Sequence, residues 1–464
     1  MMRLLASAHR SAIYLMKLLY PHPTHGKKPM NKRSKFSTVK TAWLLSSLAI
    51  AMLLSGCASI GKGAAEAVLE KSENEDTRQC QVWGEPFTGI EADLAKREGK
   101  TKVLFVHGVG DHKPGYTTEF LEKLAKELNL NVRSEGQKNI ELGTPLFPDK
   151  NLGNLRVTHL LNEQNGQELT FYELTWSEIT RQEKALLDFD TSGEYEFRRA
   201  AINGMLKKFS NDTGPDPIIY LGQSRVPILA AYAQSFCWMT TRNWEDLPNS
   251  GKHACMGMND STADRIAKDN YVIISHSLGS RIAIDGTQRI ASLLAAPEKH
   301  FGSNQIAKYT LSTKAIAALQ QKRIPIFMLS NQLPMLQLGR ELPEVAGQEA
   351  SYCDPKGANY KKRMLNETEI IAFSDPNDLL SYGIPPGFAE KYIDSRLCAK
   401  ITNVNINIAK VMDAFGLTDF ANPMEAHVGY DQDDRVVAMI ARGIGNPGTS
   451  PLIKKRCEFV KEVK

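Results

Sequence analysis

The chain has 464 residues, of which 42% are hydrophobic and 23% charged, so it is long enough to enclose a sizeable core. Its formal net charge of +5 comes from the first 56 residues, which carry nine Lys and Arg side chains and no Asp or Glu. Removing those nine from the 57 basic residues leaves 48 against 52 acidic ones, a net charge of −4. No basic patch is interleaved with aromatic residues, so we expect no nucleic-acid partner.

The first 56 residues have the organisation of a secretory leader. A basic stretch from Lys32 to Lys40 precedes Ala42–Leu54, an uncharged apolar run of about a dozen residues. This run is shorter than the roughly 20 residues that a membrane-spanning helix needs, although an uncleaved anchor is the alternative. Met30 stands directly before the basic stretch, which leaves residues 1–29 open to being an over-extended start.

Leu54-Ser55-Gly56-Cys57 closes the leader. Its small residues suit a tight cleavage site, and the Cys57 thiol is the only strong nucleophile there. The tetrapeptide resembles the lipobox of bacterial lipoproteins, which implies cleavage before Cys57 and acylation of its thiol and new amino group. Several acyl chains, each CH₂ contributing about 0.8 kcal/mol, would anchor the protein in the bacterial cell envelope. Ala58, in place of an Asp, favours the periplasmic side of the outer membrane.

Six further cysteines follow Cys57, and an even number in an exported protein is compatible with up to three disulfides. The sequence leaves fifteen pairings open, and buried free thiols are the alternative. Cys237 with Cys255, and Cys353 with Cys398, are the pairs that close local loops. No Cys or His cluster has metal-ligand spacing, so we expect no metal site and no cofactor.

We expect residues 57–99 to form a tether with an entry element, and residues 100–464 to form the folded domain. Lys102–Val106 is the first strong strand, and its two apolar faces are typical of a parallel strand buried between helix layers. A helix follows. Leu155–Leu161 and Glu168–Thr175 then alternate around an Asn-Gly pair, which predicts a hairpin.

Residues 177–261 interrupt this rhythm of strands. They hold a charged helical segment, Arg181–Lys208, and an apolar stretch, Ile218–Met239. The apolar stretch is compatible with the lining of an acyl pocket and equally with a core helix. Arg225 and Pro227 interrupt it, which argues against a membrane span.

Strands and helices alternate again after this insertion, which predicts βαβ units and a mostly parallel sheet of the α/β class. Two acidic residues at the start of the last helix are typical of helix capping. The predicted strands are Tyr271–Ile274, Ile324–Leu329, Glu369–Phe373 and Asn403–Ile408, and the predicted helices are Ser280–Leu294 and Asp433–Arg442.

Ser275-His276-Ser277-Leu278-Gly279 connects a predicted strand to a predicted helix. Small residues two before and two after Ser277 let strand and helix pass close together. The segment resembles the nucleophile elbow of the α/β-hydrolase superfamily, with its lipases and esterases, although Ser275 replaces the first Gly of G-x-S-x-G. The resemblance implies an α/β-hydrolase fold with helices on both faces of the sheet, a lid or cap formed by residues 177–261, and Ser277 as nucleophile. A turn without chemistry is the alternative.

His107-Gly108-Val109-Gly110 directly follows the first strong strand. Its glycines allow the backbone to turn its N–H groups toward a ligand. The segment resembles the oxyanion loop of lipases and esterases, which implies that the backbone N–H groups of Val109 and Leu278 stabilise an oxyanion. One such donor is typically worth about 3 kcal/mol of transition-state stabilisation. An ordinary glycine-rich turn is the alternative.

The catalytic base is expected on a loop after the last strand. Ala426-His427-Val428-Gly429-Tyr430 resembles the terminal histidine segment of lipase-like members, which implies that His427 is the base. An ordinary loop histidine is the alternative.

The catalytic acid is expected after a strand between the nucleophile and the base. The resemblance of Asn377-Asp378-Leu379-Leu380 to the acid loop of lipases favours Asp378. Asp375 lies nearer the strand end, where many hydrolases keep their acid, and stays the alternative. The order Ser277, Asp378, His427 is that of the superfamily.

Together these resemblances imply a membrane-anchored serine hydrolase that cleaves carboxylic esters through an acyl-enzyme on Ser277, without metal or cofactor. Membrane tethering and the apolar insertion favour acyl-lipid substrates, and short esters stay open. A non-catalytic envelope lipoprotein that binds a lipid or protein partner is one alternative, and an acyltransferase on the same fold is another.

Overall fold

The computed structural model describes residues 78–96, 98–133, 137–192, 199–297, 310–414 and 418–461. The predicted leader, the predicted lipid-bearing Cys57 and most of the predicted tether lie outside these residues. Within the described ranges, each helix is too short or too polar to cross a bilayer.

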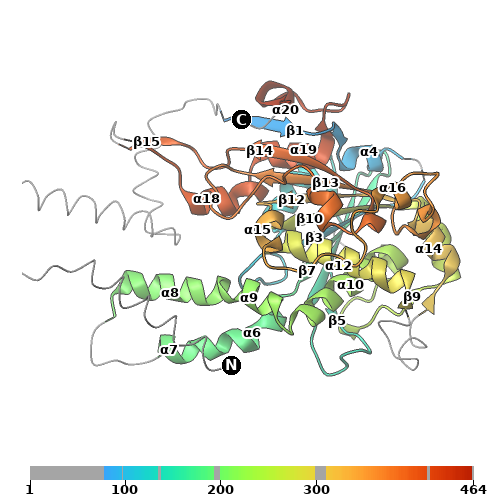
Figure 1. The fold of residues 1–464 in the computed structure, drawn as a ribbon, viewed down its shortest axis with the longest axis horizontal. Helices are drawn as coiled ribbons and strands as arrows, with labels where there is room; N and C mark the ends of the chain where they lie inside the picture. The colour runs from blue at the N-terminus through green and yellow to red at the C-terminus, as the bar shows by residue number, and fades with distance from the viewer. Residues whose placement is uncertain are drawn as a thin grey trace, which may run out of the picture. The chain divides into compact units, whose positions relative to one another are not determined.

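A twelve-stranded sheet organises the fold (Figure 1). The neighbouring strands from β14 to β7 run parallel, and β1 and β6 flank them in the antiparallel sense. The predicted α/β class with a mostly parallel sheet is therefore confirmed. In order across the sheet the main strands are β18 (Cys457–Phe459), β1 (Cys80–Trp83), β14 (Ala399–Ile406), β13 (Glu367–Ser374), β12 (Arg323–Leu329), β10 (Asn270–His276), β3 (Thr101–Val106), β7 (Glu168–Thr175), β6 (Asn154–Leu161), β5 (Lys138–Leu142) and β8 (Lys252–His253).

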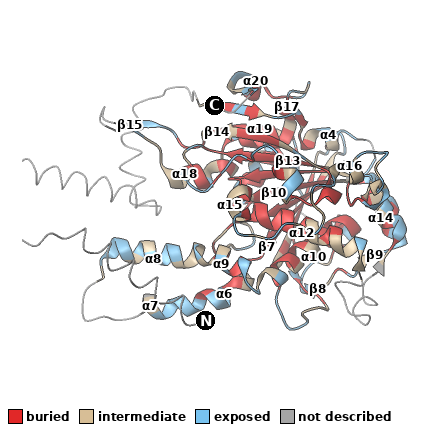
Figure 2. Ribbon diagram, viewed as in Figure 1, coloured by how far each residue is buried: buried red, intermediate tan, exposed pale blue. Residues whose placement is uncertain are grey.

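Helices cover both faces of the sheet because its central strands are apolar on both sides. In β3, Leu104 and Val106 point into one core, and Val103 and Phe105 point into the other. Figure 2 shows the central strands buried between the two helix layers. The first core is covered by α10 (Arg225–Thr241), α11 (Asp260–Lys268), α12 (Leu278–Ala295) and α14 (Thr313–Leu319), and the second by α4 (Ile90–Leu94), α5 (Thr118–Glu127) and α19 (Asp434–Arg442).

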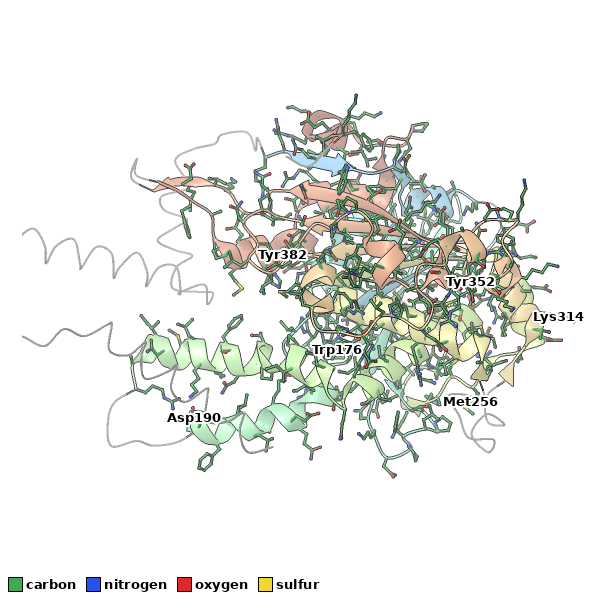
Figure 3. All side chains as sticks on the ribbon, viewed as in Figure 1. Trp176, Asp190, Met256, Lys314, Tyr352 and Tyr382 are labelled. Atoms are coloured by element: carbon green, nitrogen blue, oxygen red, sulfur yellow. A yellow bond between two sulfur atoms is a disulfide. The ribbon has the colours of Figure 1, made fainter. Side chains whose placement is uncertain are left out.

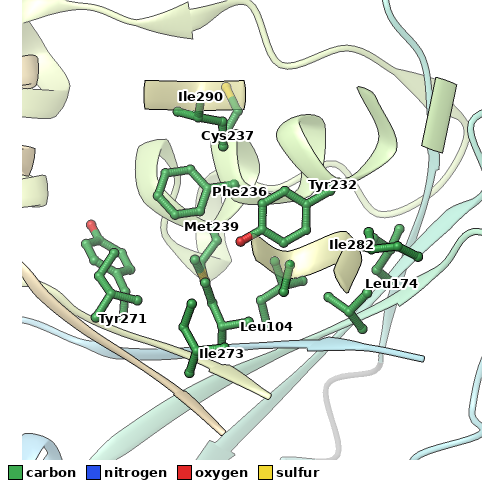
Figure 4. Packing of buried hydrophobic residues seen from close by; sticks show 14 of the residues in the cluster. Leu104, Leu174, Tyr232, Phe236, Cys237, Met239, Tyr271, Ile273, Ile282 and Ile290 are labelled. Carbon is green, nitrogen blue, oxygen red and sulfur yellow. The ribbon is translucent and has the colours of Figure 1, made fainter. Parts of the chain in front are cut away.

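The predicted apolar stretch, Ile218–Met239, forms the end of α9 (Pro215–Leu221) and most of α10. Most residues of α10 are buried, so the structure supports the interpretation of this part as a core helix. Helix α10 passes so close to α12 that a Cβ on Gly286 would overlap the ring of Tyr232. Beside this contact, the Tyr232 hydroxyl and Thr287 Oγ1 are 2.7 Å apart and hydrogen-bonded. Figure 4 shows Tyr232 and Phe236 packed among side chains of the sheet, including Leu104.

The predicted insertion begins with a helical arm, which we define as α6 (Glu178–Lys184), α7 (Asp188–Ser192), α8 (Ala201–Thr213) and α9 (Pro215–Leu221). Figure 1 shows α7 and α8 extending away from the sheet, and Figure 2 shows that much of their surface is exposed. Trp176 lies where the arm joins the sheet, and Asp190 lies on α7, farther out along the arm (Figure 3). The insertion therefore supplies both a core helix and a projecting arm.

The domain begins earlier than residue 100, which corrects the predicted boundary of the tether. Strand β1 pairs with β14 and β18, and a disulfide joins Cys80 to Cys457 across β1 and β18. A four-residue strand whose partners lie more than 300 residues away leaves no local pattern in the sequence. The two predicted local disulfides, Cys237–Cys255 and Cys353–Cys398, are confirmed.

Candidate active site

The candidate site lies at the carboxyl ends of β3 and β10, two neighbouring parallel strands at which the chain changes direction across the sheet. After β3 the chain builds β5, β6 and β7 on one side, and after β10 it builds β12, β13 and β14 on the other. Ligands of open α/β sheets bind at such a switch point, outside the carboxyl ends of the strands. The segments His107–Gly110 and Ser275–Gly279 both leave the sheet here.

Ser277 forms the tight turn between β10 and α12, with φ 54° and ψ −124°. A positive φ costs a non-glycine residue on the order of 1–2 kcal/mol, so the surrounding structure must hold the turn in place. The Ser277 N–H donates a 2.9 Å hydrogen bond to the carbonyl oxygen of Leu329 at the end of β12. This bond fixes the serine to the neighbouring strand.

Small residues on both sides of Ser277 make the turn sterically possible. A Cβ on Gly279 would clash with the carbonyl group of Val106 in β3. Ser275 is fully buried, and its hydroxyl lies 3.4 Å from the carbonyl oxygen of Phe327. A serine hydroxyl therefore finds a partner at the position where the superfamily pattern has glycine.

His107 fixes the loop that follows β3. Its Nε2 accepts a 3.1 Å hydrogen bond from the Trp176 N–H, which places the ring proton on Nδ1, 2.8 Å from the Gly108 carbonyl oxygen. The Trp176 indole stacks on the imidazole at 4.7 Å and donates from Nε1 to the His107 carbonyl oxygen. Burial is the main reason why the pKa of His107 is well below its usual value, so the ring is a neutral structural group.

The loop brings backbone against the serine. A Cβ on Gly108 would lie 2.7 Å from Ser277 Cβ, so only glycine allows this approach. The N–H of Leu278 belongs to the first turn of α12, where no helix carbonyl is available to accept it. Among the described residues the Val109 N–H also has no hydrogen-bond acceptor. The two predicted oxyanion donors are thus unused N–H groups, one directly after Ser277 in the sequence and one on the loop whose Gly108 lies against Ser277.

Two aspartates at the base of the arm hold the next residues of this loop. The Gly110 N–H donates a 2.7 Å hydrogen bond to Asp216 Oδ2, and the Asp111 N–H lies 3.2 Å from Asp212 Oδ1. Lys184 Nζ lies within 3.4 Å of carboxylate oxygens of Asp111, Asp212 and Asp216. Burial raises the pKa of Asp216 despite these partners. The arm therefore carries part of the support of the candidate oxyanion loop.

His427 and Asp378 form a hydrogen-bonded pair on the other side of the site. Asp378 Oδ1 lies 2.9 Å from His427 Nδ1, and the Ser330 hydroxyl donates a 2.7 Å hydrogen bond to Asp378 Oδ2. Burial acts to raise the pKa of Asp378, but the hydrogen bonds from His427 and Ser330 outweigh it and the pKa is lowered. An ionised carboxylate only accepts, so Nδ1 carries the proton and Nε2 of a neutral His427 is left as the basic atom.

The alternative acid, Asp375, is occupied by the backbone. Its Oδ2 accepts hydrogen bonds of 2.6 and 3.1 Å from the N–H groups of Ile408 and Ala409, and its Oδ1 accepts one of 2.7 Å from Asn377. The structure brings Asp378, and not Asp375, to His427. Of the two aspartates that the sequence left open, Asp375 has the geometry of a turn-stabilising residue.

His276 connects the serine turn to the histidine segment. Its Nε2 donates a 2.9 Å hydrogen bond to the backbone carbonyl oxygen of His427, and the two rings contact each other at 5.4 Å. Burial, and then the neighbouring His427, lower the pKa of His276 to about 3, so this ring stays neutral. His427 is predicted on a loop, but it lies in a short helix, α18 (Pro423–Val428), whose start Asn422 caps.

Among the described residues, neither Ser277 Oγ nor His427 Nε2 has a hydrogen-bond partner. Both side chains are nearly enclosed, with exposed fractions of 1% and 9%. A buried hydroxyl without a partner is costly because burial removes its bonds to water, so such a group in a folded protein needs an explanation. The site thus holds a serine hydroxyl and an imidazole nitrogen that no described residue bonds, together with two N–H groups without acceptors.

Several residues that support this site are given no role by the sequence. Ser330 follows β12, and a polar residue directly after a strand that adjoins the nucleophile strand is the signal that points to it. The Tyr430 hydroxyl lies 3.3 Å from Asp378 Oδ2 and accepts from the Asp375 N–H. Asp216 and Lys184 come from the insertion, and no local pattern links them to the loop after β3.

Within the described residues, no group of three His, Cys, Asp or Glu side chains is arranged to hold a metal ion. Comparisons of the chain with known protein families, with curated proteins and with solved structures give no match.

Proposed function

We propose that this chain is a serine hydrolase of the α/β-hydrolase superfamily that cleaves carboxylic esters. The observation that carries the proposal is the 2.9 Å contact between His427 Nδ1 and Asp378 Oδ1, beside the strained turn that presents Ser277. Acyl transfer requires a serine nucleophile and a histidine whose tautomer is fixed by a buried carboxylate, and both groups are present on neighbouring segments here.

In this mechanism His427 Nε2 takes the proton of the Ser277 hydroxyl while Oγ attacks the ester carbonyl carbon. The N–H groups of Val109 and Leu278 bind the oxyanion of the tetrahedral intermediate. The intermediate collapses, the C–O bond to the alcohol breaks, and the imidazolium donates its proton to the departing alcohol. A water molecule, deprotonated by His427, then attacks the acyl-enzyme; the bond between the acyl carbon and Ser277 Oγ breaks, and the imidazolium returns its proton to Oγ as the acid leaves. Asp378 stays ionised and holds the ring.

Exposed apolar side chains on the helical arm favour acyl-lipid substrates. Phe189 and Ile218 on the arm and Leu186 between α6 and α7 are 88%, 73% and 80% exposed, and such surface is otherwise unfavourable in water. We infer that the arm lies against a lipid phase and that Cys57, when acylated, holds the protein at the membrane of a bacterial envelope. Palmitate incorporation into the wild type and not into Cys57→Ser would test the anchor.

The activity test uses the purified protein with a fluorophosphonate probe and a series of nitrophenyl esters of increasing chain length. We expect covalent labelling and hydrolysis by the wild type, and neither by Ser277→Ala. The matched control is Ser235→Ala, because Ser235 is also buried but bonds only to its own helix, at the Ala231 carbonyl oxygen. Absence of labelling and turnover in a folded wild type contradicts the proposal. Transfer to an added alcohol in place of water would identify an acyltransferase.

A further inference from the structure

A cavity lies away from the candidate active site. It is a groove of about 600 Å³ lined largely by α10 and α12, a size typical of small-molecule sites. Its wall on α12 extends from Asp285 to Leu294, whereas Ser277 precedes the helix. At 1.5 Å per residue, the middle of this wall is roughly 18 Å along the helix from Ser277. The groove is therefore separate from the serine.

One long side of the groove is apolar. Leu229, Ala233 and Cys237 line it from successive turns of α10, and Leu293 and Leu294 line it from the end of α12. The Cys237–Cys255 disulfide closes this end. The Gln234 side chain accepts a 2.6 Å hydrogen bond from the Cys255 N–H and donates a 3.2 Å one to the Cys255 carbonyl oxygen. The apolar part is thus built on rigid elements.

Among the residues that the structure describes, the opposite end of the groove carries more positive than negative charge. The buried carboxylate of Asp285 is shared by three guanidinium groups, of Arg281 at 2.7 Å, Arg340 at 2.6 Å and Arg225 at 3.0 Å. One carboxylate cannot balance three cations, and the Tyr220 hydroxyl, 2.8 Å from Asp285, adds no charge.

Asp394 and Glu344 also line the groove, and they lie 2.6 and 3.7 Å from Arg396. Among the described residues, the three guanidinium groups around Asp285 therefore keep more positive than negative charge, and an anion is the ligand that would complement them.

We propose that this groove binds one long-chain fatty acid, with its carboxylate at Arg225 and its tail along α10 and α12. The partly exposed Arg225 offers the groove a guanidinium fork that matches a carboxylate, and the apolar wall matches a single tail. The volume suits one chain and not a diacyl lipid. The site does not depend on the proposed hydrolase activity, because it uses none of the residues around Ser277.

The test measures binding of laurate by calorimetry to the purified protein carrying Ser277→Ala, so that no turnover occurs. We expect saturable binding at one site, no comparable binding of the uncharged lauryl alcohol, and no displacement by inorganic phosphate. Arg225→Gln is expected to weaken laurate binding about tenfold, the loss of one charge-assisted hydrogen bond. Arg242→Gln, at the other end of α10 and outside the groove, is the matched control and should bind as before.

Ala233→Trp keeps the proposal testable if Arg225→Gln fails to fold, because an indole would fill the apolar part and leave the arginines in place. We expect this variant to lose laurate binding. The proposal is overturned if the wild-type site does not bind laurate, or if Ala233→Trp binds laurate as tightly as the protein without this substitution. It is also overturned if lauryl alcohol binds as tightly as laurate, or if inorganic phosphate alone displaces laurate. Esterase activity, measured separately with Ser277 intact, should persist in Arg225→Gln, so failure here is distinct from failure of the proposed function.

Discussion

Asp375 and Asp378 stand three positions apart on one loop, and both are buried, yet their oxygens have different partners. Asp375 accepts three backbone N–H groups. Asp378 accepts only one, from Leu380, and its other donors are the His427 ring and the Ser330 and Tyr430 hydroxyls. A carboxylate that satisfies backbone donors stabilises a fold. A carboxylate that orients an imidazole can also stabilise the imidazolium formed during catalysis.

Substituting the two aspartates separately should divide these roles. We expect Asp378→Asn to lower kcat by about 10⁴, because an amide favours the wrong tautomer of His427, with little change in the thermal midpoint. Asp375→Asn should instead lower stability by about 1–3 kcal/mol, since buried N–H groups lose an ionic acceptor. Ester kinetics and thermal unfolding of both variants check this. The reverse assignment follows if Asp375→Asn folds normally and loses activity.

Ser330 provides a second prediction at the level of one side chain. Its hydroxyl bonds Asp378 and lies 2.9 Å from His427 Nδ1, and its own φ is 50°. Ser330→Ala should lower kcat about tenfold, the value of one hydrogen bond to a charged group, while KM changes little. A change confined to KM would mean that Ser330 contacts substrate and does not position the acid.

The helix pair of α10 and α12 shows how one glycine sets the spacing of two elements. Helices normally pack with their axes 8–10 Å apart, a distance set by the side chains at the contact. Gly286 has no side chain, so the Tyr232 ring of α10 lies directly against the backbone of α12. Because Ser277 directly precedes α12, the packing of this helix pair helps to set the position of the serine turn.

We therefore expect Gly286→Ala to lower the free energy of unfolding by about 1–3 kcal/mol through overpacking. Gly204 in α8 is the matched control, because the nearest atom to a Cβ there is 3.7 Å away, on Arg199. Gly204→Ala should be neutral or stabilise its helix by about 0.5–1 kcal/mol. Urea unfolding of both variants measures the difference, and equal effects would show that the close contact carries no strain.

The elements that the sequence predicted best are those whose patterns are local. The apolar run of β3, the hairpin of β6 and β7 and the small residues around Ser277 each depend on a few adjacent positions, and each lies as expected. The elements that it missed depend on distant partners. Strand β1 is defined by pairing with β14 and β18, and the support of Gly110 by Asp216 joins segments 106 residues apart.

Burial of histidines around the site makes the whole molecule sensitive to acid. Burial is the first cause that lowers the pKa values of His107, His112 and His276, the last to about 3. Each ring is neutral in the fold, whereas in the unfolded chain it takes up a proton near pH 6.5. The contribution of each neutral ring to the free energy of unfolding is therefore complete above about pH 6.5, and it is lost as the pH falls toward the pKa of that ring in the fold.

Between pH 6.5 and 4.5 the free energy of unfolding should therefore fall on acidification, by up to about 1.4 kcal/mol per pH unit for each histidine. Asp431 opposes this fall, because burial raises its pKa to about 6 and its protonation favours the fold in the same range. The lowered pKa of Asp378 acts only below this window. His276→Gln removes one titrating ring. The slope of its unfolding free energy against pH should therefore be smaller than that of the wild type by up to about 1.4 kcal/mol per pH unit, the value for one proton. Urea unfolding at pH 7, 6, 5 and 4.5 gives both curves, and parallel curves would show that His276 is charged in the fold.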